Sequence, residues 1–435
     1  MKGTALPALL LAVVALFCAS CGEDSSDGAD ADGNDILQPD EQDAADPQAN
    51  DGGEGTPTDG SADDDGGSPE TSDPPAGDAP DEETGPGTWT QVTDFGLNPG
   101  DLDMYLYAPA GMPAGSALVV ALHGCTQDAA GFSELSGWNT LADSFKFYVV
   151  YAEQKTSNNI NACFNWFEPG DTARGEGEAQ SIASMVETMR TTCAVDGGRI
   201  FVTGLSAGGF MVPVLLAAYR DVFRGGAIMA GGPYGCAASM TEAFQCMSPG
   251  VTRGASEWGD AVRGACPSCA GFPVVSIFHG AGDATVSPSN LTELVKQWTD
   301  VAGTDQAADL VETVRGHDHQ VHMKDGVPVV ESWLVAGMGH GISVDPGTGC
   351  DQGGATGAYA EDRDLWSSYY AASFWGLAEG CVDPDPDPDP DGCGGCTDYF
   401  CCTEAGCDGY AWVDDAMKCY ELGTDGLMRA CPCWP

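Results

Sequence analysis

The chain has 435 residues, with 66 Asp and Glu against 16 Lys and Arg, so its net charge is −50. This charge excludes nucleic acid as a partner, because a phosphate backbone needs a basic surface to neutralise it. The 19 cysteines argue against the cytosol, and the length allows two or three domains.

The start of the chain has the pattern of an export signal. Lys2 precedes an apolar run over 6–17, which is too short to span a bilayer comfortably. The following Cys18-Ala-Ser-Cys21 resembles the lipobox of bacterial lipoproteins, although the position usually held by Leu is Cys18. We therefore expect a lipoprotein-type signal peptide over 1–20 and lipidation of Cys21. An ordinary cleaved signal is the alternative, and both lead to export.

The stretch 21–88 carries a large part of the charge. Residues 22–88 contain 22 Asp and Glu and no Lys or Arg. Because the stretch has almost no apolar residues, it cannot bury enough surface to offset chain entropy, and we expect a disordered acidic tether. A calcium-binding acidic repeat is the alternative, but the acids follow no fixed period.

Residues 89–381 have the alternating pattern of an α/β domain. Short apolar runs predict buried strands, and helical spacing separates several of them. Strands that alternate with helices predict a mostly parallel sheet covered on both faces. The expected strands cover 117–122, 147–151, 199–203, 226–230, 274–278, 319–323 and 327–335, and the expected helices cover 137–146, 175–192 and 207–220.

A candidate nucleophile lies between one of these strands and the next helix. Gly204-Leu-Ser-Ala-Gly208 fits the G-x-S-x-G pattern, in which small neighbours allow the sharp turn that raises the serine hydroxyl above the sheet. This places Ser206 at a helix N-terminus, where the amide of Ala207 can stabilise an oxyanion. A glycine-rich turn with an incidental serine is the alternative.

A serine nucleophile needs a histidine base and a carboxylate that orients it. After a nucleophile on such a turn, these residues follow in the order Ser, acid, His. His340 comes directly after the last expected strand and fits as the base, whereas His279 precedes the best-placed acid. That acid is Asp283, just past the strand 274–278. Two weaker alternatives for the acid are Asp300 and Asp318.

Three further histidines lie in the segment 315–322, which we expect to be an edge strand. Alternation along a strand places His317 and His319 on one face and His322 on the other. This disfavours the alternative that they bind one metal ion. We expect the chemistry to need no metal or organic cofactor.

The loop after the strand 117–122 should supply a second oxyanion donor. It contains His123-Gly-Cys-Thr-Gln127, and the backbone amide of Cys125 is the candidate. The thiol of Cys125 could itself be a nucleophile. In an oxidising compartment we favour a disulfide instead, with Cys163 as the candidate partner.

The end of the chain predicts a separate module. A repeated Asp-Pro run over 382–392 indicates a stiff linker. Eight cysteines within 393–435 predict a small disulfide-rich module, since zinc is disfavoured by the absence of His there. Its aromatic residues fit either the core of this module or a stacking platform for a polymer.

Six motifs occur in order over 98–376. They are Leu122-His-Gly-Cys-Thr-Gln127, Tyr151-Ala-Glu-Gln154, Cys163-Phe-Asn-Trp-Phe167, Gly204-Leu-Ser-Ala-Gly-Gly209, Phe278-His-Gly-Ala-Gly-Asp-Ala-Thr-Val286 and Gly337-Met-Gly-His340. Together these motifs resemble the polyhydroxybutyrate (PHB) depolymerase family of esterases, which includes related feruloyl and acetylxylan esterases. The resemblance implies an α/β-hydrolase with Ser206, Asp283 and His340 as the catalytic triad. It also implies an oxyanion hole formed by Cys125 and Ala207.

The same resemblance bears on the substrate. It implies that Trp166 is a wall of the substrate cleft, because the family's Cys-Trp-Asn-Trp segment lies there. The first Trp of that segment is Phe164 here, and the family's aromatic residue after the catalytic His is Ile342. Neither departure touches the triad, so the reaction class is better defined than the substrate.

We therefore expect an exported serine esterase that hydrolyses ester bonds of a polymer through an acyl-enzyme. The polymer is either a polyhydroxyalkanoate-type polyester or an esterified plant polysaccharide. The enzyme should be a monomer that contacts a membrane only through its lipid anchor. The alternative is a polymer-binding surface protein with an inactive hydrolase domain, and peptidase activity on the same fold is a weaker third reading.

Overall fold

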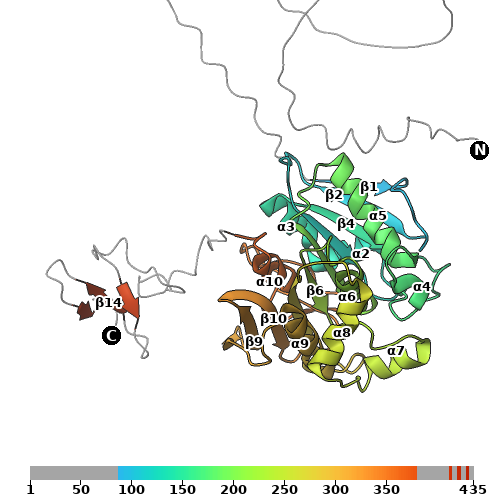
Figure 1. Cartoon of the computed structure of the whole chain (residues 1–435). Coiled ribbons are helices and arrows are strands. Elements are labelled where there is room, and N and C mark those ends of the chain that lie inside the picture. The colour runs from blue at the N-terminus through green and yellow to red at the C-terminus, as the bar shows by residue number, and fades with distance from the viewer. Residues whose placement is uncertain (1–86, 380–410, 414–418, 423–427, 431–435) are drawn as a thin grey trace, which may run out of the picture. The chain divides into compact units, whose positions relative to one another are not determined.

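The computed structural model describes residues 87–379 and three short strands near the C-terminus (Figure 1). These strands are β13 (Ala411–Val413), β14 (Cys419–Leu422) and β15 (Met428–Ala430), which form an antiparallel sheet of their own. The expected signal peptide with Cys21, the acidic tether, the Asp-Pro linker and the disulfides of the C-terminal module lie outside the described residues.

A ten-stranded sheet forms the centre of the described domain, in the order β1-β2-β4-β3-β5-β6-β7-β10-β9-β8. The strands from β4 to β10 in this order run parallel, and antiparallel strands extend the sheet at both ends. The strands are β1 (Thr88–Val92), β2 (Asp103–Ala108), β3 (Leu118–Leu122), β4 (Tyr148–Glu153), β5 (Ile200–Leu205), β6 (Gly225–Met229), β7 (Val274–Gly280), β8 (Leu310–Val314), β9 (His317–Lys324) and β10 (Val327–Val335). A separate parallel pair consists of β11 (Ile342–Val344) and β12 (Ala360–Asp362).

Helices cover both faces of the sheet. The central strands are buried along their whole length, so their side chains alternate between two apolar cores. One core contains residues of α5, α6, α8 and α9, and the other contains residues of α2, α3 and α10. The helices are α2 (Ala129–Ser136), α3 (Trp138–Phe145), α4 (Pro169–Thr172), α5 (Gly177–Thr192), α6 (Ala207–Ala218), α7 (Met240–Met247), α8 (Ala255–Ala265), α9 (Ser289–Ala302) and α10 (Ser367–Phe374). This arrangement confirms the predicted α/β fold with a mostly parallel sheet.

The prediction of an edge strand over 315–322 is wrong. β9 contains most of this segment and lies inside the sheet, between β10 and β8. The edge is β8, which pairs with β9 from Leu310↔Val321 to Val314↔His317. Its side chains are mostly exposed, so the run has no buried-strand pattern by which the sequence could reveal it.

The three histidines of β9 have separate partners in the protein. His317 Nε2 donates to the carbonyl of Arg363 (2.6 Å), and its Nδ1 accepts from the amide of Ala336 (3.1 Å). The Nδ1 of His322 contacts the carbonyl of Ala307 (3.2 Å). Each imidazole therefore contributes to packing at its own place in the fold.

The third of these histidines, His319, lies between two carboxylates and should make stability depend on pH. Its ring nitrogens are 2.9 Å from Glu312 and 3.0 Å from Glu331. Burial alone lowers the pKa of His319, but the hydrogen bonds and charges of the two carboxylates outweigh burial and raise it above its ordinary value of 6.5. A raised folded pKa stabilises the fold fully below about pH 6.5, and this contribution is lost as the pH rises through the folded value.

We expect His319→Gln to lower the free energy of unfolding by about 1.5–3 kcal/mol at pH 6, the usual range for hydrogen bonds to charged groups. The loss should be smaller at pH 9, where a neutral ring carries a single N–H for the two carboxylates. Urea unfolding at both pH values measures the difference. Gln320→Ala, on the exposed positions of the same strand, is the control. An equal loss at pH 6 and pH 9 would contradict a role for the protonated ring.

Candidate active site

Ser206 lies on a sharp turn between β5 and α6. Its backbone is in a left-handed conformation, with φ 55° and ψ −116°, which is strained for a residue with a side chain. The turn fits because Gly208 packs directly against the neighbouring strand, where an added Cβ would lie 2.4 Å from the carbonyl oxygen of Leu122. The second glycine of the G-x-S-x-G pattern, Gly208, is therefore required because there is no room for a side chain at this position.

The structure brings the three expected triad residues together from the ends of three parallel strands. His340 Nε2 lies 2.9 Å from the hydroxyl of Ser206, and His340 Nδ1 lies 2.7 Å from Oδ2 of Asp283. The other oxygen of Asp283, Oδ1, accepts the amides of Thr285 (2.8 Å) and Val286 (2.9 Å). The carboxylate is therefore fixed with Oδ2 facing His340, which favours a proton on Nδ1 and leaves Nε2 able to accept the serine proton.

The environment of Asp283 keeps its carboxylate charged. Burial would raise the pKa of Asp283, but hydrogen bonds from His279, His340 and the amide of Val286 outweigh burial and hold it well below its ordinary value. The group is consequently ionised at neutral pH and can stabilise an imidazolium at His340.

His279 is a neighbour of the acid that the sequence did not indicate in this role. Its ring is fully buried, and Nε2 lies 2.9 Å from the carbonyl of Val286 and 3.4 Å from Oδ2 of Asp283. It lies on β7, four residues before the acid, so it supports Asp283 and is no candidate for the base. The sequence signal for this contact was the motif over 278–286, which contains both His279 and Asp283.

The two weaker candidates for the acid lie elsewhere. Asp300 is at the end of α9 and pairs with Arg263 at 2.7 Å. Asp318 is exposed on β9. The hydrogen bond to His340 thus distinguishes Asp283 from both of them.

Two backbone amides near Ser206 are available to a ligand. Ala207 is the first residue of α6, and the amide of such a residue has no partner within its helix. The amides on either side of Cys125 are occupied, because Gly124 donates to Gln127 (2.8 Å) and Thr126 donates to the carbonyl of Asn161 (2.7 Å). The amide of Cys125 has no acceptor among residues 87–379.

The side chain of Cys125 forms a disulfide with Cys163. The favoured pairing is therefore present, and the reading of Cys125 as a thiol nucleophile is wrong for this oxidised form. The bond connects the loop after β3 to the segment that contains Trp166. Two further disulfides are Cys236–Cys246 and Cys266–Cys269.

Aromatic side chains pack on α6, the helix that begins after Ser206, and beside His340. Trp166 is mostly buried and stacks on Phe210 of α6, with 4.0 Å between ring centroids. Phe164 packs inward against His123, and Ile342 is buried in β11. The sequence missed Tyr359, a 46% exposed residue whose ring meets that of His340 edge-on at 6.1 Å. Tyr359 therefore provides an aromatic surface beside the base, although Ile342 replaces the residue expected there.

The chain is similar to known esterases over this domain. A family model described as esterase PHB depolymerase matches residues 102–319. A poly(3-hydroxyalkanoate) depolymerase C of Paucimonas lemoignei is 53% identical over 290 residues, which is 66% of this chain and 70% of that protein. An acetylxylan esterase of Coprinopsis cinerea is 33% identical over 262 residues, covering 59% of this chain and 70% of that protein.

A solved structure shares the fold. The acetyl xylan esterase from Aspergillus awamori superposes with a TM-score of 0.54 and 29% sequence identity. The match covers 58% of this chain and 94% of that structure.

Proposed function

The chain belongs to the esterase PHB depolymerase family and is a carboxylic ester hydrolase, and we propose that it cleaves the ester bonds of a polymer outside the cell, with Ser206 as its nucleophile. The observation that carries the proposal is the hydrogen-bonded series Ser206, His340 and Asp283 beside the free amides of Cys125 and Ala207. This set contains a nucleophile, a base, an orienting acid and two oxyanion donors.

The proposed reaction proceeds in two stages through an acyl-enzyme. His340 takes the proton of Ser206 while Oγ attacks the ester carbonyl, and it then gives this proton to the leaving alcohol. A water molecule repeats the attack on the acyl group, with His340 again as base, and releases the acid and free Ser206. Asp283 holds the imidazole and stabilises its charged form.

The developing negative charge on the carbonyl oxygen would be held by the amides of Cys125 and Ala207. Loss of one such donor typically costs about 3–4 kcal/mol of transition-state stabilisation. The disulfide to Cys163 fixes one of these two donors, and the start of α6 fixes the other.

We propose a polyhydroxyalkanoate-type polyester as the substrate. The 53% identity to a poly(3-hydroxyalkanoate) depolymerase, against 33% to an acetylxylan esterase, favours the polyester over an esterified polysaccharide. The exposed ring of Tyr359 beside His340 offers an aromatic surface to an apolar chain.

We further propose that the enzyme is exported and acts as a monomer, because one chain supplies every group of the site. The signal pattern over 1–20 and the disulfides of the described domain support export. Lipidation of Cys21 is part of this proposal. Between residues 87 and 379, no helix is both long and apolar enough to cross a bilayer.

Product analysis on three polymers tests the proposal. The purified protein should hydrolyse a chromogenic acyl ester and release soluble hydroxyalkanoates from the polyester faster than it releases ferulate or acetate from the polysaccharides. Faster release of ferulate or acetate would assign the enzyme to polysaccharides instead. If no ester is turned over, the alternative of a polymer-binding protein with an inactive hydrolase domain is favoured.

A further inference from the structure

We propose that the buried carboxyl group of Glu178 is a positioning residue, which holds the oxyanion loop (residues 123–127) and the aromatic wall (residues 163–167) in place for ester hydrolysis. The inference rests on the function proposed above. It assigns a role to Gln154 and Asn165, two motif residues that the hydrolytic chemistry does not use.

Glu178 lies in the first turn of α5, and its residue is 1% exposed. Its carboxylate contacts the protein through three N–H donors. Oε1 accepts from the side-chain amides of Gln154 and Asn165, and Oε2 accepts from the backbone amide of Asn165 at 2.8 Å. Gly100 closes over the same turn, since a Cβ there would lie 2.6 Å from the Glu178 backbone. The carboxylate is thus buried, and both of its oxygens accept hydrogen bonds from the protein.

One branch of this network leads to the oxyanion loop. The backbone amide of Gln154 donates to Nε2 of His123 (3.0 Å), so the ring proton must lie on Nδ1, which donates to the carbonyl of Gly124 (2.7 Å). Burial lowers the pKa of His123, which agrees with a neutral ring. The chain of contacts from Glu178 therefore ends one residue before the amide of Cys125.

A second branch leads to the aromatic wall. Asn165 lies between Cys163, which is bonded to Cys125, and Trp166, which stacks on Phe210 of α6. Two hydrogen bonds from Asn165 to Glu178 fix this segment by both its backbone and its side chain. The oxyanion loop and the aromatic wall thus share one carboxylate as a common anchor.

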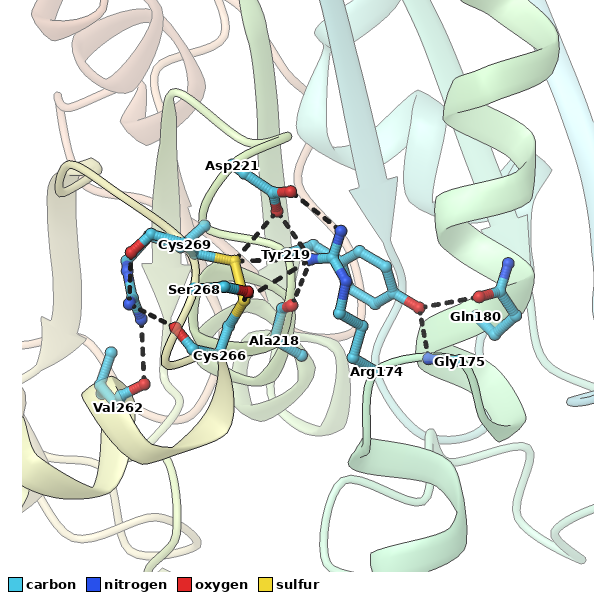
Figure 2. A network of polar contacts seen from close by, with 11 residues as sticks. Arg174, Gly175, Gln180, Ala218, Tyr219, Asp221, Val262, Cys266, Ser268 and Cys269 are labelled. Atoms are coloured by element: carbon cyan, nitrogen blue, oxygen red, sulfur yellow. Dashed lines mark hydrogen bonds and ion pairs between the residues drawn. A yellow bond between two sulfur atoms is a disulfide. The ribbon is translucent and has the colours of Figure 1, made fainter.

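The segment just before α5 is held in place by contacts with Tyr219 and Asp221, which follow α6. Arg174 forms a two-pronged ion pair with Asp221, at 2.7 and 2.9 Å, and its guanidinium lies over the ring of Tyr219 (Figure 2). The hydroxyl of Tyr219 accepts the amide of Gly175 (2.9 Å) and donates to Gln180 (3.0 Å). These contacts flank Glu178 in sequence, so the anchor cannot easily shift along the helix axis.

The ionisation of Glu178 provides a readout of this role. Burial raises the pKa of Glu178 to about 8, the nearby charge of Asp171 adds to the rise, and the amide donors of Asn165 and Gln154 offset part of it. Among residues 87–379, Asp171 is the charged side chain that acts on the Glu178 carboxyl group, and the hydrogen-bond donors from the other segments are amides. The ionised carboxylate accepts all three N–H groups, whereas the protonated form must turn its own O–H toward one of them.

We expect Glu178→Gln to lower kcat/KM for a chromogenic ester by about 10–100-fold, because small displacements of catalytic groups have effects of this size. The new amide would place an N–H against the backbone N–H of Asn165. Wild-type kcat/KM should rise through an inflection near pH 8, and the variant should lack this inflection. Glu187→Gln is the matched control, an exposed carboxylate on the same helix that pairs with Arg190, and it should leave kcat/KM unchanged.

Amide hydrogen exchange tests the network without any assay of activity. Glu178→Gln should accelerate exchange in both 123–127 and 163–167, whereas Glu187→Gln should not. The exchange rates test the hydrogen-bond network even if the proposed function is wrong. A wild-type protein that hydrolyses no ester would instead show that the proposed function is wrong. If Glu178→Gln keeps wild-type kcat/KM and wild-type exchange in both segments, or if the wild-type profile has no inflection near pH 8, the proposal is overturned.

Discussion

Replacement of Ser206 by alanine should lower kcat for ester hydrolysis by about 10⁶-fold, the loss typical of a serine hydrolase without its nucleophile. No other hydroxyl in residues 87–379 is bonded to His340. KM should change little, because the substrate walls and the free amides remain. Alanine adopts the strained turn no less readily than serine, so the variant should fold. Initial rates on a chromogenic ester measure kcat and KM. Labelling with a fluorophosphonate, which reacts with a serine nucleophile, should be lost in the variant.

The control for this substitution is Ser144→Ala. Ser144 is exposed on α3, and its hydroxyl donates to the carbonyl of Thr140. This variant should keep wild-type kcat and full labelling. Retained turnover in Ser206→Ala would show that another residue is the nucleophile, and it would remove the basis of the acyl-enzyme mechanism.

The parts of the site that depend on local geometry could be predicted from the sequence. The tight turn at Ser206 requires glycine at Gly204 and Gly208, so the G-x-S-x-G motif predicts the turn directly. His340 and Asp283 follow from the order of residues and from their places after β10 and β7. Cys163 was a candidate partner of Cys125, and the structure contains that disulfide.

The parts that depend on packing between distant segments could not be predicted. Glu178 contacts Asn165 across 13 residues and lies in no motif, and Tyr359 reaches His340 from a loop with no regular pattern. β8 escaped detection because an exposed edge strand lacks apolar alternation. Because the sequence did not reveal β8, β9 had no predicted neighbour on that side and was predicted to be the edge strand.

A second substitution with a large expected effect is Asp283→Asn, which should lower kcat at neutral pH by about 10⁴-fold. The amides of Thr285 and Val286 fix the position of Oδ1, so the asparagine must place its oxygen there and its NH₂ group toward His340. His340 Nδ1 then has to accept, and the ring proton moves to Nε2. That nitrogen faces Ser206 and can no longer take its proton.

The pH profile separates this tautomer effect from a loss of charge alone. Since hydrogen bonds hold the pKa of Asp283 below its ordinary value, its carboxylate stays ionised at all pH values above the usual carboxylate range. The carboxylate of wild-type Asp283 should therefore cause no loss of kcat near neutral pH, whereas Asp283→Asn should stay inactive at every pH near neutrality. Asp300→Asn is the control, because that carboxylate pairs with Arg263 and should leave kcat unchanged. If Asp283→Asn kept most of the wild-type kcat, or Asp300→Asn lost as much, the orienting role of Asp283 would be wrong, since the geometry ties that role to the single hydrogen bond at His340 Nδ1.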